Sequence, residues 1–155
     1  MIVRPTTAQL LRDVRHELAE AVVPEVRSTT VRVTLEQIDI ILEQCAVRSG
    51  SEIAWMVEEI DEIEAYAADV ADATGDRATI DALAAGRAGR SGSLQLDDLA
   101  DDYNLMSEAL SCAIEACMTD PAQRPLRERG VEILRLRRAE RETVVRANWR
   151  LGGRG

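Results

Sequence analysis

The sequence predicts an all-α protein, an antiparallel bundle of about five helices. Three observations lead to this fold class. Apolar residues recur three and four positions apart along most of the chain, no segment shows the alternation typical of a strand, and breaks rich in Gly, Pro and Ser are few and short. With 155 residues, 46% of them hydrophobic, the chain can bury a core. We expect one helical-bundle domain over residues 1–151 and a disordered tail over residues 152–155.

The first two helices are expected on either side of Pro24. Thr6 followed by Gln9 has the pattern of a capping box, which predicts a helix that begins at Thr6. Pro24 ends that helix, because proline cannot continue it. Ser28 is a good N-cap for a second helix, which the segment "VRSGSE" (residues 47–52) is expected to break.

Three further long helices are expected after this break. Ser49 followed by Glu52 repeats the capping-box pattern and predicts a third helix, which Gly75 ends. A short helix over residues 78–85 and a flexible loop, "GRAGRSGS" (residues 86–93), follow. Ser93 is expected to cap the fourth long helix, which Pro121 ends, and the last helix is expected over residues 124–151.

The charge of the chain is unevenly distributed. The net charge is −9, and all 19 basic residues are Arg. Residues 1–49 carry 6 Arg and 7 acids (−1), residues 50–120 carry 3 Arg and 17 acids (−14), and residues 121–155 carry 10 Arg and 4 acids (+6). We expect the basic C-terminal segment to lie against the acidic middle or to bind an anionic partner. A chain this acidic is not expected to bind nucleic acid.

The cysteines and the hydropathy indicate a cytoplasmic protein. Cys45, Cys112 and Cys117 are odd in number and lack C-x-x-C spacing, which indicates reduced thiols. The first residues, "MIVRPTTAQLL", lack the long apolar run of a signal peptide, and no segment reaches the length of a membrane span. We therefore expect no membrane association.

A dense run of acids, "EEIDEIE" (residues 58–64), contains the one pattern that suggests metal chemistry. Glu59 and Glu62 lie one turn apart on a helix, and such carboxylates can converge on Mg²⁺. The spacing is similar to that of all-α nucleotide pyrophosphohydrolases, which add a second acidic pair on a later helix. Asp98 and Asp101 would supply that pair here.

The same helix also suggests a protein interface. Trp55 and Tyr66 share a helical stripe with the two glutamates, so the stripe can contact another helix or subunit while its carboxylates pair with Arg. We favour this interpretation over the metal site. Trp149, with Arg146 and Arg150 nearby, is a second candidate anchor, because Trp and Arg are enriched at binding hot spots.

A resemblance covers about the first 60 residues. The runs "RPTTAQLLRDVRHELAEAVVPEV" and "VRVTLEQIDIILEQCAVRSGSEIAWM" resemble an uncharacterised family of small bacterial helical proteins, encoded beside aminoglycoside-phosphotransferase-like kinases and acyl-CoA dehydrogenases. The matching positions are Arg4, Pro5, Thr6, Leu10, Leu11, Val23 and Pro24. The resemblance implies an accessory role near acyl-CoA or phosphotransfer metabolism. The matching positions are structural, so the resemblance does not assign an active-site residue to this chain.

These observations favour a non-enzymatic accessory protein without a cofactor. We expect it to bind a protein partner, such as a kinase-like or acyl-CoA dehydrogenase-like protein, and to self-associate as a dimer. Two alternatives remain open: a Mg²⁺-dependent nucleotide pyrophosphohydrolase that uses the E-x-x-E pair, and a carrier of small apolar ligands between its helices.

Overall fold

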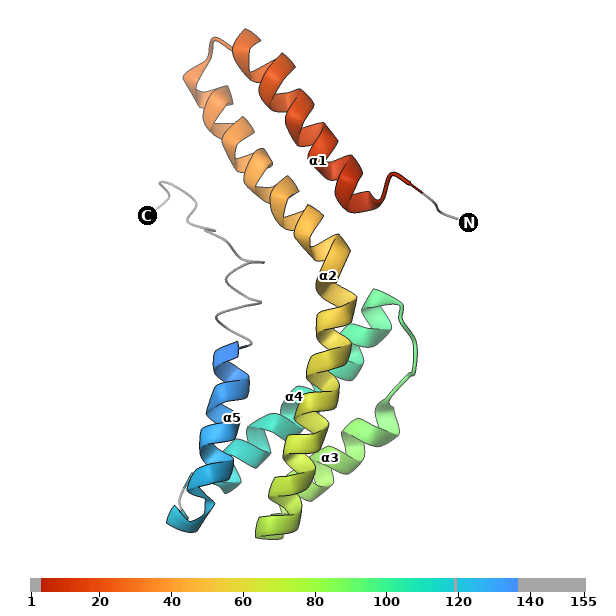
Figure 1. Cartoon of the computed structure of the whole chain (residues 1–155), viewed down its shortest axis with the longest axis vertical. Helices are drawn as coiled ribbons and strands as arrows, with labels where there is room; N and C mark the ends of the chain where they lie inside the picture. Colours follow the sequence, from red (N-terminus) through yellow and green to blue (C-terminus); the bar gives the residue numbers. More distant parts are fainter. Residues whose placement is uncertain (1–3, 119, 137–155) are drawn as a thin grey trace. The chain divides into compact units, whose positions relative to one another are not determined.

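The structure is a computed structural model that describes residues 4–118 and 120–136, and within these residues it is built from helices without a strand. The predicted all-α class is therefore confirmed (Figure 1). Five α-helices follow one another: α1 (Thr7–Glu17), α2 (Thr29–Thr74), α3 (Arg77–Gly89), α4 (Leu96–Ala116) and α5 (Arg124–Leu136). Contacts divide the described residues into two compact units, the N-terminal unit (residues 4–52) and the C-terminal unit (residues 53–136).

The N-terminal unit is a helical hairpin, in which α1 runs antiparallel to the first part of α2 (Figure 1). The predicted capping box is present: the Thr6 hydroxyl accepts from the Gln9 backbone at 3.2 Å, and the Gln9 side chain accepts from the Thr6 backbone at 2.8 Å. After α1 come a π-helical turn, η1 (Leu18–Val22), and a 3₁₀ turn, η2 (Val23–Glu25), which contains Pro24. The first helical segment thus ends at this proline, as predicted.

The predicted helix break at residues 47–52 is wrong, because α2 runs through it without interruption. The polar residues of this segment are satisfied inside the helix. The Ser49 hydroxyl donates to the Ala46 carbonyl at 3.1 Å instead of capping a new helix, and Glu52 pairs with Arg48 one turn earlier. Gly75, with φ of 64°, ends α2 where the sequence predicted a C-terminal stop.

The hydrophobic core lies in the C-terminal unit and is formed by residues of α2, α3, α4 and α5. On α2 the buried residues follow helical spacing of three and four, so one broad side of the helix faces the core. The large residues of this core are Ile60, Ile63, Tyr66, Val70, Leu83, Leu99, Met106, Leu110 and Ile133.

The connection between α3 and α4 is shorter than the flexible loop predicted over residues 86–93, because α3 continues to Gly89. Gly86 and Gly89 allow α3 to approach α4 closely. A Cβ on Gly86 would lie 3.0 Å from Met106 Cε, and one on Gly89 would lie 2.6 Å from Leu105 Cδ1. These glycines therefore serve helix packing.

Helix α4 begins and ends close to its predicted limits, and α5 begins at the predicted residue, Arg124. Helix α4 begins at Leu96 with Gln95 as N-cap, rather than at a Ser93 cap. A 3₁₀ turn, η3 (Pro121–Gln123), precedes α5, which is described to Leu136. The rest of the helix expected over residues 124–151 and the expected tail over residues 152–155 lie outside the described residues.

Candidate functional site

The two glutamates of the E-x-x-E pair lie in different surroundings. Glu59 is buried and accepts a hydrogen bond from the Tyr103 hydroxyl of α4 at 2.7 Å. Glu62, one turn later, is exposed. A shared cation would need both carboxylates on one open face. Glu59 instead joins α2 to α4 inside the C-terminal unit.

The neighbouring acids of "EEIDEIE" pair with arginines of α3 and of the turn that follows it. Glu64 accepts from Arg87 at 2.8 Å and from Arg90 at 3.1 Å. Arg90 also donates to Asp61 at 2.6 Å, and this hydrogen bond raises the pKa of the guanidinium above its ordinary value. These ion pairs fasten the C-terminal end of α3 to α2.

The proposed second acidic pair lies on an exposed face of α4. Asp98 and Asp101 are both exposed, and the buried acid of this segment is Asp102. Asp102 accepts from the Ser91 backbone at 3.0 Å and from the Ser91 hydroxyl at 2.8 Å, which fixes the turn between α3 and α4. The sequence analysis missed this residue. Its spacing of three and four from the core residues Leu99 and Met106 was the available signal.

Side chains that could ligate a metal are dispersed over the described part of the chain. Among the residues that the structure describes, His, Cys, Asp and Glu side chains do not gather in groups of three or more that could hold a metal ion.

The aromatic residues of the predicted interface are less accessible than the sequence suggested. Trp55 is half-buried. Tyr66 of α2 is fully buried where α5 packs against α2. The Arg129 guanidinium of α5 lies 5.7 Å from the centre of the Tyr66 ring. Tyr66 therefore contacts another helix of its own unit, α5, which is one of the two contacts expected for this stripe. The other candidate anchors, Arg146, Trp149 and Arg150, lie outside the described residues.

The N-terminal unit carries the most unusual surface of the described chain. Among residues 4–52 the only buried hydrophobic residue is Ala46, whereas every member of the core cluster belongs to the C-terminal unit. Eight large apolar residues of the hairpin are exposed, with Leu10 at 50% and Val14 at 49% on α1. The full set is Leu10, Val14, Val22, Val31, Val33, Ile38, Ile40 and Ile41. Exposed apolar side chains that lie next to one another on a helix face mark binding sites in soluble proteins.

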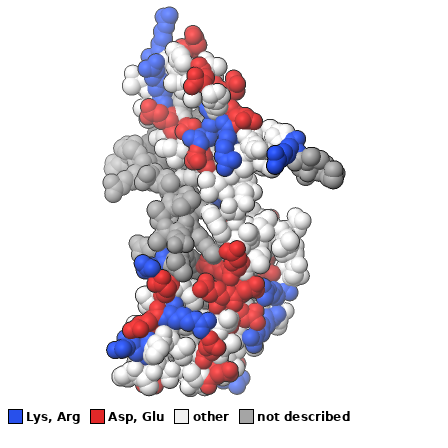
Figure 2. Space-filling model, viewed as in Figure 1, with Lys and Arg blue, Asp and Glu red and all other residues white. Residues whose placement is uncertain are grey.

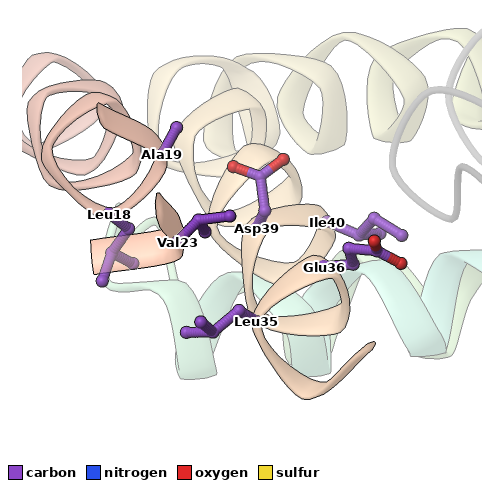
Figure 3. A pocket seen from close by; sticks show the side chains of 7 residues that line it. All are labelled: Leu18, Ala19, Val23, Leu35, Glu36, Asp39 and Ile40. Carbon is purple, nitrogen blue, oxygen red and sulfur yellow. The ribbon is translucent and has the colours of Figure 1, made fainter. Parts of the chain in front are cut away.

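A pocket of about 320 Å³ lies within the N-terminal unit, where the turn after α1 faces α2. Figure 3 shows that Val23 points toward α2, beside Asp39. The lining is mostly apolar, and it comes from Leu18, Ala19, Val23, Leu35, Glu36, Asp39 and Ile40.

Electrostatic contacts hold the hairpin together beside this pocket. Arg15 of α1 donates to Asp39 through two nitrogens, at 2.8 and 3.0 Å, and also pairs with Glu43. The hydrogen bond from Arg15 holds the pKa of Asp39 below its usual value. Asp39 is therefore a fixed anion at the edge of the pocket, already neutralised by a guanidinium.

Charged side chains are distributed differently over the surface of each unit. Figure 2 shows acidic side chains that gather into a patch on the C-terminal unit, whereas the N-terminal unit mixes both signs. This agrees with the charge of −14 over residues 50–120 and −1 over residues 1–49.

Comparisons with known proteins leave the family of this chain open: no family model, curated protein or solved structure matches it. Among the described helices, none is both long enough and apolar enough to cross a membrane.

Proposed function

We propose that this protein is a non-enzymatic accessory protein of the cytoplasm that binds a partner protein through its N-terminal unit. The observation that carries this proposal is the placement of large apolar side chains in that unit. Eight of them are exposed, and the unit has no large buried apolar residue of its own among residues 4–52.

The energetics of burial support a binding role for this surface. Complete burial of a Val, Leu or Ile side chain contributes about 1.5–3 kcal/mol. A side chain that is half exposed, such as Leu10 or Val14, can therefore gain about 1 kcal/mol when a partner covers it. Among residues 4–52 no third α-helix accompanies α1 and the first part of α2, so a docked partner can supply that cover.

The helix α1 offers the simplest docking face. Leu10 and Val14 lie one turn apart and are exposed together. The partner class that we propose comes from the resemblance of the first 60 residues: a kinase-like or an acyl-CoA dehydrogenase-like protein encoded beside the gene.

A binding titration with purified neighbours tests the proposal. The full-length protein is titrated against the kinase-like or dehydrogenase-like protein encoded beside its gene, as wild type and as the Leu10→Glu/Val14→Glu double variant. We expect the double variant to bind at least about 10-fold more weakly, a loss of about 1.4 kcal/mol. Ile80→Glu, on an exposed site of α3 in the C-terminal unit, is the control and should bind as wild type.

Two results would count against this proposal. One is the absence of binding to every adjacent gene product. The other is an affinity that the α1 double variant leaves unchanged while circular dichroism shows both proteins equally helical.

The pocket supports a second candidate function, the transport of a small apolar ligand. Its volume of about 320 Å³ lies at the lower end of the range of ligand pockets, and its lining is mostly apolar. Native mass spectrometry and titration with n-octanoate test this function. Binding that Ala19→Trp abolishes supports the carrier, since the indole would fill the pocket. No uptake, or uptake that this variant leaves intact, contradicts it.

A further inference from the structure

The first part of α2 carries an apolar stripe with the spacing of a coiled coil. Val31, Ile38 and Cys45 recur every seven residues, and Thr34 and Ile41 follow the first two of them by three. This alternation of three and four is the heptad pattern by which two helices pack side by side. All five residues are exposed, and together we call them the α2 stripe.

The α2 stripe points away from α1. Helix α1 contacts α2 at Asp39 and Glu43, through Arg15. At about 100° per residue, Ile38 lies about 100° and Ile41 about 160° around the helix from Asp39, both in the same direction. The hairpin contact therefore leaves the stripe uncovered, in agreement with exposures of 38% for Ile38 and 42% for Ile41.

The α2 stripe is also free of charge, which matters in a chain with a net charge of −9. The row on one side of the stripe is polar but neutral, and the row on the other side is apolar. The neutral polar row is Thr30, Gln37 and Gln44, of which Gln44 is buried, and the apolar row is Leu35 and Leu42, both half-buried. Two copies can thus approach through this face without repulsion between like charges.

A second apolar face of α2, around Ile40, is not free of charge. Ile40 is exposed there, but Glu36 and Glu43 lie within one turn of it. Two copies that met through Ile40 would bring these acids together. The distribution of charge therefore selects the α2 stripe over the Ile40 face for contact between identical chains.

The polar member of the stripe is compatible with burial. The Thr34 hydroxyl donates to the Thr30 carbonyl of its own helix at 3.2 Å. Its burial in an interface would leave no donor unpaired, so the desolvation cost stays low. A heptad that is otherwise apolar thus has no position that opposes pairing.

We propose that the α2 stripe packs against the α2 stripe of a second copy, so that two N-terminal units join into a dimer. This surface differs from the α1 face assigned to the partner protein, and a dimer through α2 leaves Leu10 and Val14 outside the stripe. The stripe extends over about 21 Å of helix. Because the stripe is short, we expect a weak dimer, with a dissociation constant on the order of micromolar.

Sedimentation equilibrium of the full-length protein tests the dimer, at concentrations from about 1 to about 200 µM. We expect wild type to shift from monomer to dimer within this range. Ile38→Glu/Ile41→Glu should remain monomeric, with the dissociation constant raised at least about 10-fold. Ile80→Glu is the matched control, because Ile80 has the same 38% exposure as Ile38 but lies on α3, and it should dimerise as wild type.

A photo-crosslinking residue at Thr34 identifies what covers the stripe. Mixed ¹⁴N- and ¹⁵N-labelled protein distinguishes crosslinks between copies from crosslinks within one chain. Crosslinks between copies, from Thr34 to residues 28–48, support the proposal. Crosslinks confined to residues 137–155 of the same chain would overturn it, since this chain's own C-terminal segment would then be the occupant.

Two sedimentation results would also overturn the proposal: a wild-type protein that is monomeric throughout, and a dimer that Ile38→Glu/Ile41→Glu leaves intact. The double variant of α1 distinguishes binding of the partner protein through α1 from dimerisation through the α2 stripe. Leu10→Glu/Val14→Glu should retain the dimer, so failure of partner binding and failure of dimerisation are seen in different variants.

Discussion

Gly130 of α5 lies directly against the phenol ring of Tyr66 on α2. A Cβ at Gly130 would lie 2.8 Å from Tyr66 Cζ and 2.9 Å from Ile114 Cγ1 of α4, both inside van der Waals contact. This glycine is thus the point where α5 closes on two other helices, and Arg129 beside it covers the same ring.

Substitution of Gly130 tests how tightly α5 packs against Tyr66. Gly130→Ala should lower the free energy of unfolding by about 1–3 kcal/mol, because the added methyl forces a rigid ring and a core isoleucine apart. Urea denaturation measures the change. A variant as stable as wild type would show that α5 can move away from Tyr66 without cost.

Gly50 provides the matched opposite case. It lies inside α2, and a Cβ at this position would have no neighbouring atom within 4 Å, so Gly50→Ala meets no steric obstacle. Alanine loses less backbone entropy in a helix than glycine does, and the variant should gain about 0.5–1 kcal/mol. Urea denaturation measures the free energy of unfolding of Gly50→Ala and Gly130→Ala against wild type. A loss of stability at Gly50 would contradict the continuous helix.

The Tyr66 hydroxyl is buried without a hydrogen-bond partner among the described residues. Burial, together with the neighbouring Cys117, raises the pKa of this phenol above its ordinary value. Tyr66→Phe removes the unpaired hydroxyl and should stabilise the protein by about 1 kcal/mol in thermal or urea denaturation. A destabilised variant would instead show that the hydroxyl has a partner, for which the Cys117 thiol is the nearest candidate.

The buried pair of Tyr103 and Glu59 should respond in the opposite direction. Tyr103→Phe deprives a buried carboxylate of a donor at 2.7 Å, which should cost about 1–3 kcal/mol of unfolding free energy. Urea denaturation compares this variant with Tyr66→Phe. Both variants lose one phenol hydroxyl, but Tyr103→Phe should lower the free energy of unfolding and Tyr66→Phe should raise it. Equal effects in the two variants would contradict the hydrogen-bond assignment.

Asp76 should make stability depend on acid pH. As N-cap of α3 it accepts from the Thr79 backbone and hydroxyl, both at 2.8 Å, and these bonds hold its pKa below the ordinary 3.8. Because the folded pKa is the lower one, the stabilisation is present above pH 3.8 and is lost as the pH falls through the folded pKa.

Thermal unfolding of wild type and Asp76→Asn measures this dependence. Asn also caps helices well, so the two proteins should have similar Tm values near neutral pH. Below about pH 4 the Tm of wild type should fall more steeply than that of the variant. Parallel curves would show that Asp76 does not contribute.

The sequence predicted those features of the fold that depend on neighbouring residues. The capping box at Thr6 and the stop at Gly75 were correct, because each rests on contacts within one or two turns. Within the described residues the number of α-helices also agrees with the prediction, although for a different reason than expected. The second and third predicted helices are one helix, α2, and the short helix near residue 80 is a full one, α3.

The predictions differ from the structure where the surroundings of a residue depend on a helix distant in the sequence. A single helical wheel assigns one core face to α2, but in the C-terminal unit three helices contact it. Arg87 of α3, Tyr103 of α4 and Gly130 of α5 each reach a different residue of α2. The burial of Glu59 and Tyr66 follows from these long-range contacts, which local spacing does not contain.

The candidate binding surface was partly visible in the sequence. The apolar stripe of α2 has the spacing of a core face, and apolar spacing alone does not tell a helix that is covered by its own chain from one that is uncovered. Only the exposure of Ile38 and Ile41 in the folded hairpin makes that distinction.

The close approach of α3 to α4 at Gly86 and Gly89 has a practical meaning for anyone who divides this chain. Composition alone marks "GRAGRSGS" as a dispensable linker, the first place to insert a tag or to separate two fragments for expression. Its first half is instead packed helix, where even one extra methyl meets Met106 or Leu105. A tag inserted there would disrupt the core of the C-terminal unit, whereas the exposed residues around Leu94 leave both helices whole.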